Sequence, residues 1–173
     1  MPSRRDFLTG VAAAGFSAIA GCSGYLDRTN GTVFRKTVSV AHPTNDRGPV
    51  WVSAAILSLG GDGKSVIAQY DPEYAAVNGG AGELSVSAEQ EEVMAQRFTD
   101  VEYIAGVMPG EGESGPIREA HRTDFNDMHV GGSATVGEYS TDDGGYFRLH
   151  GADSPQQPLT IKETTQFDLD DWF

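Results

Sequence analysis

Residues 50–70 read VWVSAAILSLGGDGKSVIAQY and carry the clearest fold signal in the chain. Val50 to Leu59 form an almost continuous apolar run, which fits a buried strand or a short buried helix, because periodicity does not separate the two. A glycine-rich turn, Gly60 to Gly63, follows the run, and Val66 to Tyr70 then return as a second apolar segment. Two apolar segments joined by such a turn predict a β-hairpin.

Period-two segments continue on both sides of this hairpin and predict further strands. They lie at Thr32 to His42, Glu83 to Val86, Val101 to Met108, Ile117 to Phe125, Val130 to Val136, Tyr146 to His150 and Pro158 to Phe167. One helix is expected, because Ser87-Ala88-Glu89-Gln90 forms a capping box ahead of a segment that ends near Arg97 or Phe98. The expected fold is mostly β: a single β-sandwich or small β-barrel of about eight strands with one short helix, after an N-terminal signal segment.

The first 22 residues read MPSRRDFLTGVAAAGFSAIAGC. Arg4 and Arg5 precede a weakly apolar run from Phe7 to Ala20, which small residues and a cysteine close. This is the layout of a secretory signal. The run is shorter than the roughly 20 residues that a permanent membrane-spanning helix needs, so an anchor helix is disfavoured.

Two motifs in this segment carry a family resemblance. Ser3-Arg4-Arg5-Asp6-Phe7-Leu8 resembles the twin-arginine export signal, departing from it at Thr9, and Ile19-Ala20-Gly21-Cys22 resembles a lipobox. The resemblance to twin-arginine-exported lipoproteins implies folding in the cytoplasm, passage through the export machinery as a folded unit, and a lipid on Cys22. The protein is then expected to be tethered to the outer face of the cytoplasmic membrane.

These motifs divide the chain into a signal peptide (1–21), a lipid-anchored tether (22–31) and a β-rich extracytoplasmic domain (32–173). Cys22 is the only cysteine, so no internal disulfide forms and lipid attachment accounts for the thiol. Asn30-Gly31-Thr32 is a sequon, which makes Asn30 a candidate glycosylation site in an exported chain.

The mature chain is strongly acidic. Removing residues 1–21 leaves 152 residues and changes the formal net charge from −13 to −14. Such a balance argues against nucleic acid or an anionic lipid surface as a partner. Lysine is scarce and the acid is spread along the chain, so the composition resembles that of lipoproteins from halophilic archaea, which must stay soluble in concentrated salt.

Histidines provide the candidate metal site. Glu119 and His121 are expected on one face of the strand predicted at 117–125, and His129 and His150 flank the hairpin that follows. A Zn or Cu(II) site built from Glu119, His121, His129 and His150 is therefore an alternative. A blue-copper site is excluded, because it needs a free cysteine thiolate.

No catalytic motif occurs in the chain: there is no Gly-x-Ser-x-Gly elbow, P-loop, dinucleotide fingerprint or His-Glu-x-x-His. The expected function is a non-catalytic, lipid-anchored binding or scaffolding module with an unidentified envelope partner and no cofactor. A metal-binding protein is the first alternative and a small hydrolase the second. The tail Asp168 to Phe173 is expected to be a terminal strand that docks Trp172 and Phe173 on the core, with a partner-binding peptide as the alternative.

Overall fold

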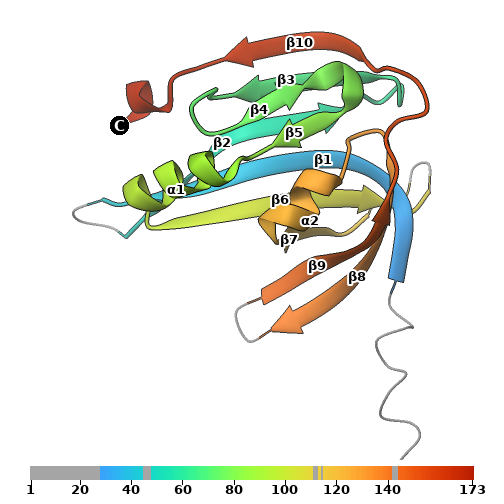
Figure 1. Cartoon of the computed structure of the whole chain (residues 1–173), viewed down its shortest axis with the longest axis horizontal. Helices are drawn as coiled ribbons and strands as arrows, with labels where there is room; N and C mark the ends of the chain where they lie inside the picture. The colour runs from blue at the N-terminus through green and yellow to red at the C-terminus, as the bar shows by residue number, and fades with distance from the viewer. Residues whose placement is uncertain (1–27, 45–47, 111–112, 114, 142–143) are drawn as a thin grey trace, which may run out of the picture.

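The computed structural model describes residues 28–44, 48–110, 113, 115–141 and 144–173. The predicted mostly β class is confirmed: within these residues there are ten strands and two α-helices (Figure 1). No helix in this part of the chain combines the length and apolar character needed to span a bilayer. The strands are β1 (Arg28–His42), β2 (Val50–Leu59), β3 (Ser65–Tyr70), β4 (Ala76–Asn78), β5 (Glu83–Ser85), β6 (Asp100–Met108), β7 (Ile117–Ala120), β8 (Ser133–Thr141), β9 (Gly144–Ala152) and β10 (Thr160–Gln166). The helices are α1 (Ala88–Arg97) and α2 (Arg122–Asp127), and the 3-10 turns are η2 (Gly79–Ala81) and η3 (Leu169–Trp172).

Eight strands form one sheet in the order β10-β3-β2-β1-β6-β7-β9-β8. The start of β1 also pairs with β8, while the rest of β1 pairs with β6, so β1, β6, β7, β9 and β8 close into a five-strand ring. Gly31 lies where β1 passes between these partners, and a side chain there would collide with the backbone of Met108. The ring has the connectivity of an OB barrel with β2 to α1 inserted after its first strand, a likeness of fold that carries no function.

The predicted hairpin is confirmed and extends the sheet beyond the ring. β2 and β3 pair antiparallel, with Leu57 opposite Ala68. The Asp62 carboxylate holds the turn by accepting hydrogen bonds from the backbone N–H of Lys64 and Ser65, both at 3.0 Å. β10 then adds to β3 in parallel and forms the outer edge of this extension (Figure 1).

The helices and the β4–β5 hairpin cover one face of the sheet (Figure 1). The capping box of α1 is confirmed: Ser87 Oγ accepts from the Gln90 N–H at 3.1 Å, and Gln90 Oε1 accepts from the Ser87 N–H at 2.9 Å. Met94 on α1 and Phe125 on α2 are fully buried beneath this layer. The main core therefore lies between the sheet and these covering elements.

A lysine lies inside this core. Lys36 on β1 is fully buried, and its Nζ donates to the carbonyls of Leu84 and Met128, both at 2.6 Å. The same nitrogen lies 4.3 Å from the ring centroid of Phe125. Lys36 thus connects β1 to β5 and to the end of α2.

The strand predicted at 117–125 is wrong beyond Ala120, where β7 ends and α2 begins. Polar side chains of α2 supply hydrogen bonds that a continued strand would not make. Asn126 Oδ1 accepts from the Val86 N–H at 3.0 Å, its Nδ2 donates to the Val86 carbonyl at 2.9 Å, and Asp124 accepts from the Leu149 N–H at 3.0 Å. These long-range contacts outweigh the local alternation.

Two predicted boundaries also change. β1 begins at Arg28, so the last four residues of the predicted tether belong to the folded domain. The C-terminal tail is a 3-10 turn rather than a strand: Leu169 is fully buried, whereas Trp172 is 64 % and Phe173 is 48 % exposed. The expected docking of both aromatics on the core is therefore wrong for Trp172.

Candidate functional site

The residues of the predicted export signal and lipid site, Arg4, Arg5 and Cys22, lie outside the described residues, so these assignments remain predictions. Asn30 lies within β1, where it pairs with Thr135 and is exposed to solvent. Its side chain is accessible, and glycosylation there also remains a prediction.

The four predicted metal ligands are not brought together. His121 is the N-cap residue of α2, His129 lies between α2 and β8, and His150 on β9 lies against Gly137. Burial and the Asp100 carboxylate raise the pKa of Glu119. The nearby His121 partly opposes this rise. Among the described residues no group of three or more histidine, cysteine, aspartate or glutamate side chains is placed to hold a metal ion.

The sheet face opposite the helices is open, and we call it the outer face. In β1 the side chains of Val38 and Val40 point into the core, so the alternation of a strand directs Thr37 and Ser39 to the outer face. A register shift between Val38 and Ser39 in the β1–β2 pairing keeps Ser53 on the same side. Two hollows on this face meet at Ser53.

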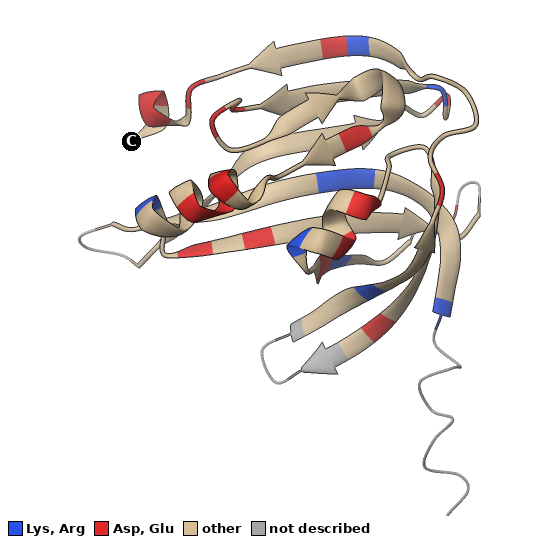
Figure 2. Cartoon of the chain, in the orientation of Figure 1, with Lys and Arg blue, Asp and Glu red and all other residues tan. Residues whose placement is uncertain are grey.

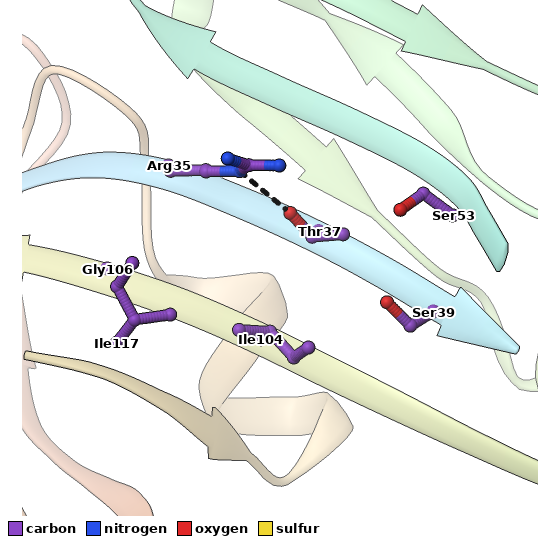
Figure 3. Close-up of a pocket in the computed structure, with 7 residues that line it drawn as sticks. All are labelled: Arg35, Thr37, Ser39, Ser53, Ile104, Gly106 and Ile117. Carbon is purple, nitrogen blue, oxygen red and sulfur yellow. Dashed lines mark hydrogen bonds between the residues drawn. The ribbon is translucent and has the colours of Figure 1, made fainter. Parts of the chain in front are cut away.

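The first hollow, which we call the arginine hollow, crosses β1, β6 and β7 and has a volume of about 270 Å³ (Figure 3). Arg35 lies at one end and donates from Nε to the Thr37 hydroxyl at 3.2 Å. Gly106 also lines this hollow, and a side chain at that position would collide with the ring of Phe34. The remaining lining residues are Ser39, Ser53, Ile104 and Ile117.

The second hollow, the tryptophan hollow, lies over β2, β3 and β10 and has a volume of about 500 Å³. Trp51 and Trp172 line it and are 44 % and 64 % exposed. They are the only two tryptophans of the chain. The other lining residues are Val52, Ser53, Ile56, Gln69, Thr165 and Phe167.

Trp172 is held in place by the anchored C-terminal turn. Asp71, only 4 % exposed, accepts a hydrogen bond from the Leu169 N–H at 2.8 Å. Asp170 forms an ion pair with Arg97 of α1. The ring of Trp172 lies 5.7 Å from that of Phe167. The tail is thus fixed to three parts of the domain, which positions Trp172 before any ligand arrives.

The lining of both hollows is nearly uncharged. Arg35 is the only ionisable residue among the lining residues, in a chain that carries 25 acidic side chains. Figure 2 shows that acidic residues are spread over strands and helices of the described domain. Glu102 and Glu119 lie on neighbouring strands near the arginine hollow, and burial together with nearby carboxylates raises the pKa of both.

The groups available in the hollows suit binding rather than acid–base chemistry. Ser53, Gln69 and Thr165 offer hydroxyl and amide groups beside the indole rings. The lining residues include no histidine, carboxylate or cysteine that could act as a base or nucleophile. A concave, mainly apolar surface with a few neutral polar groups is typical of a ligand site.

The sequence patterns do not predict this site. The apolar run predicts a buried Trp51, and simple alternation would place it on the same face as the core residues Ala55 and Leu57. The register shift at Ala54 in the β1–β2 pairing turns Trp51 to the outer face instead. No local pattern marks this shift, so the available signal was only the second tryptophan, Trp172, near the end of the chain. The residues that line the other side of the tryptophan hollow are set by the parallel pairing of β10 with β3, which no local pattern reveals.

Comparison with known proteins gives no relative from which a role could be transferred. No model of a protein family matches the chain, and no curated protein or solved structure is significantly similar to it. The candidate site is therefore defined by the geometry and chemistry of this chain's own residues.

Proposed function

We propose that the chain is a non-catalytic binding module of the cell envelope, exported through its twin-arginine signal and held by a lipid on Cys22. In this proposal the outer groove, meaning the arginine and tryptophan hollows joined at Ser53, holds the partner. The envelope assignment is supported by the two N-terminal sequence motifs. The binding assignment is supported by the groove.

The observation that carries the proposal is the exposure of Trp51 and Trp172 on one hollow. Keeping large aromatic side chains in contact with water costs free energy, and exposed apolar patches on a monomeric domain mark interaction sites. Both rings stay exposed although the neighbouring Leu169 is fully buried, so the tail packs without hiding Trp172. This arrangement favours a surface that is completed by a ligand.

The test is binding to envelope material. The full chain carrying Cys22→Ser is collected from the medium and mixed with envelopes from cells that lack the protein, and the bound fraction is measured by co-sedimentation. We expect saturable binding, weakened about tenfold or more by Trp51→Ala or Trp172→Ala, since truncating an aromatic anchor costs more than about 1.4 kcal/mol.

Val93→Ala serves as the matched control, because Val93 is an exposed apolar residue on α1, on the covered side of the sheet. This change should leave binding unaltered. Sedimentation no greater than that of an unrelated acidic protein would disprove the proposed function.

A further inference from the structure

We infer that the outer groove binds an uncharged glycan chain of the envelope, an inference that rests on the binding function proposed above. The first argument is the aromatic platform. Indole faces carry a negative π-surface that attracts the polarised C–H groups of an approaching ring. Trp51 and Trp172 present such rings at one end of the groove, where the anchored tail holds Trp172 in place.

The polar groups between the aromatics are neutral. Ser53, Gln69 and Thr165 provide hydroxyl and amide groups, each able to donate and to accept. Within the described part of the chain, the Ser53 hydroxyl and the Gln69 amide make no hydrogen bond to another residue. Sugar hydroxyls also donate and accept, so they match such groups without burying a charge.

The charge pattern decides against other stacking ligands. Nucleic acid strands also stack on aromatic side chains, but their binding needs basic residues that follow the phosphates. The tryptophan hollow has no lysine or arginine, and the chain carries a formal net charge of −13. No carboxylate is among the lining residues, which weakens the case for a cationic ligand, although Glu102 and Glu119 lie near the arginine hollow and Thr165 is hydrogen-bonded to Glu163 at 3.4 Å. An uncharged ligand is therefore the best match.

The shape of the groove favours a chain over a single ring. Its lining residues come from β10, β3, β2, β1, β6 and β7, which are consecutive neighbours in the sheet. At about 4.8 Å between strands, this path is about 24 Å long. Arg35 lies toward the far end, where its remaining N–H groups can donate to ring or hydroxyl oxygens (Figure 3).

The experiment separates glycan from peptide by chemistry. Envelopes are digested exhaustively with protease, and half of the soluble digest is oxidised with periodate, which cleaves the vicinal diols of sugars and is then quenched. Each half competes with intact envelopes for the full-length Cys22→Ser chain. We expect the untreated digest to compete, and the oxidised digest to need at least a tenfold higher concentration.

Every other outcome is informative. Equal competition by both halves, with a sugar assay confirming that the oxidised half has lost its glycan, identifies a peptide ligand. No competition by either half, with intact envelopes still bound, identifies a folded protein partner. Both results overturn the glycan inference and leave the binding function standing. Failure to bind intact envelopes overturns the binding function itself. Sedimentation of the chain without envelopes would show that a second copy occupies the groove, and this also overturns the inference.

Discussion

At the scale of single residues, Lys36 is the most unusual group in the core. Desolvation lowers its pKa from 10.5 to about 7, although the carboxylates of Glu83 and Asp127 oppose the shift. A neutral amine still has two N–H groups, which matches the two carbonyl acceptors of Leu84 and Met128. Lys36 can therefore keep both hydrogen bonds when it is uncharged.

This arrangement predicts a pH-dependent stability. Between pH 7 and about 10.5 the unfolded chain keeps the Lys36 proton that the folded chain releases, so the free energy of unfolding rises with pH across this window. Below pH 7 both the folded and the unfolded chain bind the proton, so Lys36 no longer makes the free energy of unfolding depend on pH. Chemical denaturation at pH 6 to 9 should show the rise, and Lys36→Met should flatten it. The same slope in both proteins would contradict this account.

Trp51 and Trp172 make the groove directly observable, because they are the only tryptophans. A change in intrinsic tryptophan fluorescence therefore reports on the tryptophan hollow alone. Trp51→Phe should retain part of the ligand affinity that Trp51→Ala loses, since a phenyl ring preserves a smaller aromatic face. Equal affinities for Trp51→Ala and the parent chain would exclude stacking on this residue.

At the scale of elements, one buried carboxylate, that of Asp71, is a main anchor of the C-terminal turn. Asp71 accepts from the N–H groups of both Glu73 and Leu169. Asp71→Ala leaves the Leu169 donor without its acceptor and should lower the free energy of unfolding by about 1–3 kcal/mol. It should also move the tryptophan emission to the red as Trp172 loses its position.

Asp171→Ala is the matched control for this change, because Asp171 lies in the same turn with its side chain exposed. Its effect on stability should stay within about 0.5 kcal/mol. If Asp71→Ala behaved like Asp171→Ala, the anchoring of the tail by Asp71 would be refuted.

The elements also show which parts of the fold are legible in the sequence. The β2–β3 hairpin and α1 were predicted because their signals are local: an apolar pair around a glycine turn, and a capping box. α2 was missed because Asn126 and Asp124 bond to backbone groups of Val86 and Leu149, far away in the chain. The parallel β10 and the groove that it borders required tertiary pairing in the same way.

At the scale of the whole molecule, the proposed lipid anchor limits how far the groove can lie from the membrane. If Cys22 carries the lipid, only residues 22–27 precede β1, and their fully extended reach is at most about 22 Å. The domain would then stay close to the membrane surface. This position suits a module that binds fixed envelope material rather than a diffusing solute.

The proposed export route and lipid attachment can be tested by two separate changes. Replacing Arg4 and Arg5 by lysine should leave the precursor in the cytoplasm, because the receptor reads adjacent arginines. Cys22→Ser should instead release the folded domain into the medium, because no lipid is attached. Cell fractionation with immunodetection measures both. An unchanged distribution in both variants would disprove the assignment of the N-terminus.

The central claim is that the tryptophan hollow is the binding surface, and acrylamide quenching of tryptophan fluorescence tests it most directly. With intact envelopes bound to the full Cys22→Ser chain, and the fluorescence of envelopes alone subtracted, Trp51 and Trp172 become covered, so we predict a several-fold fall in the quenching constant. Envelopes that bind the chain while leaving the quenching constant unchanged would contradict the claim, because the partner would then occupy another surface.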